Sequence, residues 1–416
     1  MPNTPTSPAE RFFALDALRG FALIGVFLIN FGYGDTPLVQ PGDIKTSWDA
    51  VASWFLVDAF EDRFWPLFSL SFGIGFSLLL LRSRRRGEPF LSPYLRRLAA
   101  LFVFGWLTFV VFEGIPILNR YAIGGLVLLL FVRASNRTVL CCAALAFLLS
   151  VVDAPIINRY ERWHAARHRL VLEQRDGPRA VQEEQARAQE SRALEQFDST
   201  APYVCFVLHH TVGLGRWVTS LGFYISREVQ IVALFLLGLY VGRRGILEQP
   251  DRHLRLLRTV AVAGLAVGIT SWSIYQQVKV WPQSSLAIEL LQRFDYTVFY
   301  LAWALCYGAT VVLLTLRPAI RSRMMPLAYT GRLALTNFLM QFVLGFVVLS
   351  RFGLGWSDRF GTATRFGWVL VVFALQVLFS RWWLRRFSFG PAEWLWRIVT
   401  YGPRRTSARP ISPAVA

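Results

Sequence analysis

Cysteine is scarce in this 416-residue chain, and the spacing of its cysteines excludes two kinds of structure. The four residues, Cys141, Cys142, Cys205 and Cys306, lie in or beside apolar runs and lack the spacing of metal ligands. We therefore expect them to be small packing residues, with no disulfide framework and no bound metal. The chain also lacks a GxxxxGK(S/T) phosphate loop and an HExxH helix. An ATP-driven pump of the common kind is therefore excluded.

Acidic residues are few beside the basic ones: 26 Asp and Glu stand against 44 Lys and Arg, a net charge of +18. In a soluble protein such an excess would suggest binding to nucleic acid. Here 54% of the residues are hydrophobic, the mean hydropathy is +0.42, and arginine clusters separate apolar runs of membrane length. Basic loops between spans are typical of cytoplasmic loops. The composition predicts an all-α polytopic membrane protein in a lipid bilayer, with no nucleic-acid partner.

Hydropathy predicts about ten transmembrane helices. The N-terminal residues MPNTPTSP lack the basic start and cleavage site of a signal peptide, so we expect the first apolar segment to remain as a helix. With both termini cytoplasmic, the basic loops at 82–97, 133–137, 242–258 and 317–323 all face the cytoplasm. The predicted spans are 11–33, 64–81, 98–112, 117–132, 138–152, 229–241, 259–278, 289–316, 327–349 and 366–384.

Two groups of spans are expected, separated by a charged insertion. The first group covers 11–152, with about five spans, and the second covers 201–402. Between them, 153–200 is rich in charges of both signs and predicts an extracytoplasmic helical excursion. Within the second group, 201–225 is apolar but interrupted by charges and glycines, which favours an interfacial or re-entrant segment. Disordered tails are expected at 1–10 and 403–416.

The first span carries unusual polar residues. Asp16, Arg19 and Gly20 fall on one side of a helix, and Asn30 follows in the apolar run. A carboxylate and a guanidinium at membrane depth are costly unless they pair with each other or with a ligand. This pattern predicts a polar site, with Asp16, Arg19 and Asn30 as candidate substrate-binding residues.

The second span is preceded by Glu61 and Arg63, which either contact a substrate or form an interfacial pair at a helix entry. Gly73 and Gly75 within the span favour close helix packing over a phosphate cradle.

A turn near the third span gathers Glu113, Arg120 and Tyr121. Glu113 either pairs with Arg120 across the turn or serves as an acid or base in a membrane cavity.

The ninth span holds Arg332, Asn337 and Gln341. Interhelical hydrogen bonds would explain Asn337 and Gln341 without a substrate. Arg332 is either a topology charge or a ligand for an anionic head group or phosphate.

His209 and His210 are the histidines beside an apolar stretch. Either could act as a general base, because a histidine titrates near neutral pH. The alternative is that both reach toward water at an interface.

Six segments in order resemble the YeiB-like family of bacterial inner-membrane proteins, a domain of unknown function. They are RFFALDALRGFALIGVFLIN, FEDRFWPLFSLSFGIGFSLLL, EGIPILNRYAIGG, LFLLGLYVGRRGIL, YTGRLALTNFLMQ and FGPAEWLWRIVTYG. The resemblance spans roughly 11–402 and implies a multi-pass protein of the inner membrane. More distantly it implies kinship with transmembrane acyltransferases, which share the LD-x-RG start found here at Leu15, Asp16, Arg19 and Gly20. Two positions depart from these patterns. The family usually has an aspartate shortly after the glycine of the turn at 113–116, where this chain has Pro116. The acyltransferase relatives use a histidine close to the first or second helix, and this chain has no histidine before His164.

Two functions follow as hypotheses. The first is a membrane acyltransferase that takes an acyl group from a cytoplasmic thioester, acyl-CoA, and gives it to a small or sugar-like acceptor. His209, His210, Glu61 or Glu113 would then act as the base, while Asn30 or Asn337 would stabilise the oxyanion. The second is a transporter or exporter of a small polar or anionic metabolite, in which the same residues line a pathway. A structural or regulatory role, and a homo-oligomeric state, are left open.

Overall fold

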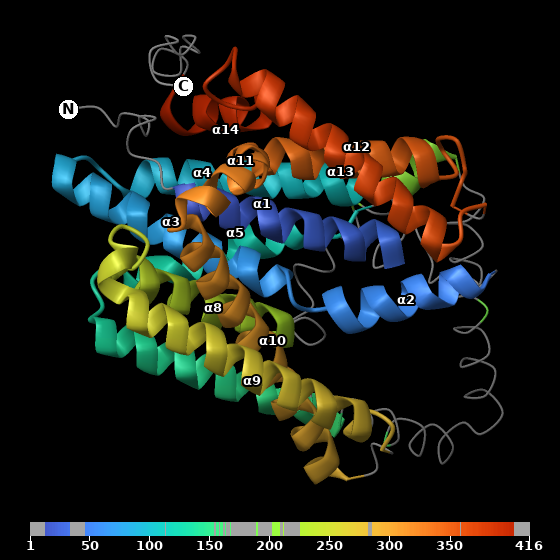
Figure 1. Ribbon diagram of the computed structural model, residues 1–416, viewed down its shortest axis with the longest axis horizontal. Coiled ribbons are helices and arrows are strands. Elements are labelled where there is room, and N and C mark those ends of the chain that lie inside the picture. Colours follow the sequence, from blue (N-terminus) through green and yellow to red (C-terminus); the bar gives the residue numbers. More distant parts are fainter. Residues whose placement is uncertain are drawn as a thin grey trace.

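The computed structural model describes residues 13–33, 46–112, 114–153, 155–157, 159–160, 163, 167, 189, 202–208, 211, 225–281, 285–357 and 359–402. In these ranges the chain is helical and contains no strand. The α-helices pack side by side as a bundle (Figure 1). Their bounds are α1 Phe13–Phe27, α2 Ser47–Phe60, α3 Trp65–Arg86, α4 Leu91–Trp106, α5 Ile117–Val127, α8 Ile225–Arg243, α9 Leu254–Val278, α10 Leu286–Thr315, α11 Pro318–Arg332, α12 Ala334–Leu349, α13 Thr362–Leu384 and α14 Pro391–Tyr401.

Several helices change their winding at an end. α1 continues as the π-helix η2 (Leu28–Tyr33), and α4 continues as the π-helix η3 (Leu107–Val111). Short 3₁₀ turns extend α5 (η4, Leu128–Phe131) and precede α9 (η5, Pro250–His253). A further long apolar helix covers Asn136–Ile157.

Seven helices of the described chain are long and apolar enough to cross a membrane, or eight if the bent pair α11 and α12 counts as one span. Each of the ten expected spans has a helix at its position. The two helices beyond these eight are α5 with η4, which is short, and α8, which carries Arg227 and Glu228 near its start. The all-α polytopic membrane architecture is therefore confirmed.

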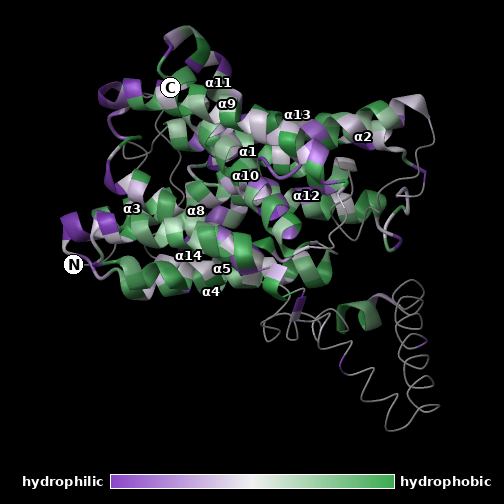
Figure 2. Cartoon of the chain, turned by 90° about the horizontal axis from the view of Figure 1, so that it is seen from below, coloured by the Kyte–Doolittle hydropathy of each residue, from purple (hydrophilic) through white to green (hydrophobic). Residues whose placement is uncertain are grey.

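Apolar side chains cover the outside of the bundle. Val262 and Val267 on α9, like Val371 and Leu375 on α13, are between 45% and 69% exposed. Figure 2 shows hydrophobic residues along the sides of the helices, with hydrophilic residues gathered where α3 ends. A helix that is apolar all round is typical of a membrane span.

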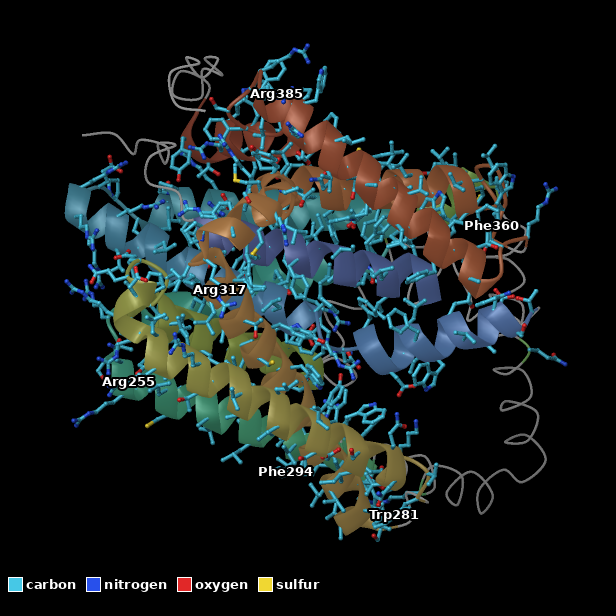
Figure 3. The ribbon with its side chains drawn as sticks, in the orientation of Figure 1. Arg255, Trp281, Phe294, Arg317, Phe360 and Arg385 are labelled. Carbon is cyan, nitrogen blue, oxygen red and sulfur yellow. The ribbon has the colours of Figure 1, made fainter. Side chains whose placement is uncertain are left out.

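Arginines collect at one end of the bundle, which we call the basic end. This end contains the last turns of α3, α8 and α13 and the first turns of α9 and α11. Figure 3 shows Arg255 and Trp281 at opposite ends of the α9 segment, and Arg385 and Phe360 at opposite ends of the α13 segment. At this end Arg243 donates hydrogen bonds to the carbonyl oxygens of Ala134 and Phe131, which joins α8 to the end of η4.

Two glycine contacts bring backbones together in the core. A methyl group on Gly73 of α3 would lie 2.1 Å from the carbonyl oxygen of Phe235 on α8. A methyl group on Gly20 of α1 would lie 1.9 Å from the carbonyl oxygen of Leu327, and one on Gly331 would lie 1.8 Å from that of Asp16. The packing role expected of Gly73 is confirmed, and α1 and α11 meet at a second contact of the same kind.

The α1–α11 contact gives a test of stability. Gly20→Ala should lower the free energy of unfolding by about 1–3 kcal/mol or more, because the added methyl group forces two backbones apart. Thermal unfolding of the purified protein in detergent measures the effect.

Gly367→Ala in α13 is the matched control, because a methyl group there has no atom within 4 Å. Equal midpoints for the two variants would contradict the close α1–α11 contact.

Candidate functional site

A cavity of about 370 Å³ lies inside the bundle, with walls from α1, α3, α4, α5, α11, α12 and α14. Its volume is in the range of sites that bind small molecules and cofactors. Its wall is charged near the basic end, apolar in the middle and polar again at the far end. We call it the central cavity.

Three arginines from three helices line the part of the cavity nearer the basic end: Arg19 of α1, Arg97 of α4 and Arg332 at the end of α11. We call them the arginine triad. The Gly20–Gly331 contact places Arg19 and Arg332 beside each other, since each arginine adjoins one of the two glycines. Arg19 also lies against Gly75 of α3, where a methyl group would be 3.1 Å from its Nη2 atom.

The triad has few internal partners. Arg19 pairs with Asp16 at 3.8 Å, as the spacing predicted. Arg332 donates from Nη2 to the carbonyl oxygen of Ser388 at 3.0 Å, but its buried Nε has no hydrogen-bond partner within the described ranges. The Arg97 guanidinium lies 3.9 Å from the ring centre of Trp396, whose Nε1 donates to the Arg97 carbonyl oxygen. The guanidinium groups therefore keep donors for an anion.

Glu393 of α14 lines the same part of the cavity as the triad, and both of its carboxylate oxygens already accept hydrogen bonds. It accepts hydrogen bonds from the backbone amides of Leu335 (2.8 Å) and Thr336 (3.1 Å) and from the Thr336 hydroxyl. It thus caps the first turn of α12, just after the 72° bend between α11 and α12. Desolvation raises the pKa of Glu393, and the hydrogen bonds from Thr336 and Leu335 oppose that shift.

A fourth arginine lies near Arg97 but does not line the cavity. Arg397 of α14 stacks on Phe389 at 3.9 Å, and its Nε and Nη2 have no hydrogen-bond partner in the described chain. Burial lowers the pKa of Arg397 to about 10, so the group still carries its charge at neutral pH.

The middle of the cavity is apolar. Phe68 and Phe72 of α3 face it with Leu101 of α4 and with Leu335 and Phe338 of α12. Such a lining favours a hydrocarbon or aromatic part of a ligand over a hydrated ion.

The far end of the cavity is polar but internally paired. Arg227 pairs with Asp62 at 3.3 Å, and Arg120 pairs with Glu228 at 3.6 Å. The Tyr121 hydroxyl lies 2.8 Å from that of Ser69. Hydrogen-bonding groups in balanced pairs suit a neutral polar ligand better than a second anion.

The candidate site residues predicted from the sequence do not all lie in one site. Arg19, Asn30, Arg120, Tyr121 and Arg332 line the central cavity. Glu61 ends α2, Arg63 lines a second groove, and Asp16 contacts Arg19 from outside the cavity lining.

Asn337 and Gln341 belong to the α12–α13 contact. The Asn337 amide donates to Ser380 at 2.9 Å, and that of Gln341 donates to Gln376 at 3.0 Å. Interhelical hydrogen bonding, one of the two explanations offered for this pair, accounts for both contacts.

Three candidate bases, His209, His210 and Glu113, lie outside the described residues, as do the two terminal tails and most of the segments 153–200 and 201–225. Among the residues that the structure describes, no group of three His, Cys, Asp or Glu side chains could hold a metal ion.

The sequence reading missed four residues that shape the site: Asp62, Arg97, Arg227 and Glu393. Arg97 was counted with the loop arginines because the third span was expected to begin at 98, whereas α4 begins at Leu91. A signal for Glu393 was present: FGPAEW places Gly390 before a proline-initiated helix with an acid in its first turn.

The fold and cavity define the class of protein: a polytopic α-helical membrane protein with an internal cavity that is basic at one end and apolar in the middle. Residues 241–403 match the family model described as "Protein of unknown function (DUF418)". This match and the relatives below support the resemblance to the YeiB-like family of proteins of unknown function that the motifs predicted.

The relatives resemble the chain along nearly its whole length. It is 29% identical over 413 residues to "Uncharacterized protein YxaH" of Bacillus subtilis (strain 168), covering 95% of this chain and 96% of the relative. It is 28% identical to "Uncharacterized 39.9 kDa protein in amylase 3'region" of Bacillus acidopullulyticus, covering 95% and 96%. It is 26% identical to "Uncharacterized protein YeiB" of Escherichia coli (strain K12), covering 94% and 96%. No solved structure matches the chain significantly.

The Glu393 cap can be tested separately from any activity. Glu393→Ala should lower the free energy of unfolding by about 1–3 kcal/mol, because it leaves the first amides of α12 and the Thr336 hydroxyl without their acceptor. Thermal unfolding in detergent measures the loss.

Glu393→Gln retains one acceptor oxygen and should lose clearly less stability than Glu393→Ala. An equal loss in the two variants would show that the side-chain volume matters and the cap does not.

Proposed function

We propose that this protein is a membrane acyltransferase whose acyl donor binds in the central cavity. The observation that carries the proposal is the arginine triad in the wall of a largely apolar cavity, because this arrangement matches a ligand with an anionic head and a hydrocarbon tail. An acyl thioester such as acyl-CoA has that form.

The donor would enter from the basic end. Loops rich in arginine face the cytoplasm in membrane proteins, and acyl thioesters are made there. The protein would therefore lie in the bacterial inner membrane with the triad toward the cytoplasm and both termini inside. The anionic part of the donor would contact Arg19, Arg97 and Arg332, and the acyl chain would lie along Phe68 and Phe338.

The acceptor would bind at the far end, beside Asn30, Arg120 and Tyr121. Paired charges and hydroxyl groups there suit a neutral, hydroxylated molecule such as a sugar. In this scheme a base, His209 or His210, takes the proton of the acceptor hydroxyl, and the oxygen attacks the thioester carbonyl. The thiolate leaves, and Asn30 stands on the cavity wall where it could donate to the oxyanion.

A transporter or exporter of an anionic metabolite is the second candidate. The 72° bend between α11 and α12 lies in the cavity wall, and broken helices of this kind form the solute sites of many transporters. The amides at the start of α12 are, however, already capped by Glu393. A bound anion would therefore depend on the arginines.

The decisive experiment is binding of decanoyl-CoA to the purified protein in detergent. We expect saturable binding that Arg19→Gln weakens about tenfold or more, since a hydrogen bond to a charged group contributes on that scale. Free CoA should bind more weakly than decanoyl-CoA, because it lacks the chain that fills the apolar part of the cavity.

Arg85→Gln is the matched control, because Arg85 is an exposed arginine at the same end of the bundle. Equal weakening in both variants would show that Arg19 does not bind the donor specifically. If folded protein binds no decanoyl-CoA, the acyltransferase proposal fails, and solute uptake into vesicles then tests transport.

A further inference from the structure

A second cavity, of about 350 Å³, lies between α2 on one side and α9 and α10 on the other. We call it the lateral groove. It is separate from the central cavity, and the proposed acyl transfer does not use it. Its lining is rich in aromatic rings, among them Trp54, Phe55 and Trp272. Trp54 is 63% exposed and Phe55 42%, so the rim of the groove is an exposed apolar surface.

Arg63 is the buried charge of this groove. The residue is only 3% exposed, and its guanidinium carbon lies 4.7 Å from the ring centre of Phe299 and 5.0 Å from that of Trp303. Within the described part of the chain, its side chain forms no ion pair and its buried Nη1 has no hydrogen-bond partner. The carboxylate of Asp58 lies near enough to act on the Arg63 charge, but the Nη1 donor is buried without a partner among the described residues. An unpaired buried donor is costly, and an acceptor on a bound molecule would satisfy it.

Asp58 adds a charge of the opposite sign to the groove wall. Its Oδ1 atom accepts hydrogen bonds from Trp272 (3.2 Å) and from Gln276. Its second carboxylate oxygen receives no hydrogen bond from the described residues. The groove thus offers donors for an anion at Arg63 and an acceptor for a cation at Asp58, with tryptophan rings that also favour a cation.

We propose that the lateral groove binds one phospholipid of the surrounding bilayer that carries a protonated amine, of the phosphatidylethanolamine class. The lipid phosphate accepts hydrogen bonds from Arg63, and the ammonium group lies at Asp58. The acyl chains leave over Trp54, Phe55 and Ile269, which are exposed on the lipid side. A lipid fits better than a free phosphate, because the groove opens on an apolar surface and offers binding groups for both charges of the head group.

Native mass spectrometry of the full-length protein in detergent tests the proposal. Dioleoylphosphatidylethanolamine, dioleoylphosphatidylglycerol and dioleoylglycerol are titrated in turn. We expect one tightly retained phosphatidylethanolamine, weaker retention of phosphatidylglycerol and no specific retention of dioleoylglycerol. Equal retention of dioleoylglycerol, or displacement of the lipid by millimolar inorganic phosphate, would overturn the proposal.

Variants separate the two charges. Arg63→Gln should weaken retention of both phospholipids about tenfold or more. Arg323→Gln, at an exposed arginine of α11, should leave it unchanged. Asp58→Asn keeps an oxygen acceptor for Trp272 and Gln276, and should abolish only the preference for phosphatidylethanolamine over phosphatidylglycerol.

The Asp58→Asn result decides the matter even if Arg63→Gln does not fold. An unchanged lipid preference in folded Asp58→Asn would overturn the assignment of the ammonium group. Unchanged retention in folded Arg63→Gln would overturn the assignment of the phosphate.

Discussion

The contact between Gly20 of α1 and Gly331 of α11 is the constraint on which the candidate site depends. Two backbones approach there so closely that neither position can accept a methyl group. Because Arg19 and Arg332 adjoin these glycines, the contact fixes where two of the three triad guanidinium groups leave their helices. The LD-x-RG start is thus a packing motif: its glycine, Gly20, allows α1 and α11 to approach closely, and its arginine, Arg19, lines the central cavity beside that contact.

Charged side chains inside the bundle are tolerated because each of them has a different kind of support. Asp62 and Arg227 neutralise each other, and Glu393 is held by the amides of a helix start. Arg97 is supported by the face of a tryptophan. Stacking leaves the hydrogen-bond donors of a guanidinium unused, whereas an ion pair occupies them. The stacked arginines Arg63 and Arg97 therefore remain able to bind a ligand.

Sequence reasoning predicted the architecture well, because membrane spans are long and apolar and their loops are basic. It also selected Arg19 and Arg332, since charges inside apolar runs stand out. Arg97 could not be selected, because Arg96 and Arg97 look alike in the sequence. Only the register of α4 exposes Arg96 and turns Arg97 toward the cavity. Asn337 and Gln341 illustrate the converse, since polar residues at membrane depth serve helix contacts as readily as ligands.

The sequence marks Glu393 as an acid in the first turn of a helix, but it does not reveal what that carboxylate contacts. Its role exists only because α11 and α12 are bent apart, and a bend of 72° is not visible in a continuous apolar run. The helix that carries it, α14, has 11 residues and is too short to register as a span.

One face of α1 and η2 borders the cavity from Arg19 to Asn30. At the usual helical rise these two residues are about 16–17 Å apart along the axis. A molecule that touches both ends must bridge that distance, and a shorter one leaves apolar wall uncovered. Under the proposed function, the number of residues between Arg19 and Asn30 would set the length of acyl chain that the cavity accommodates best.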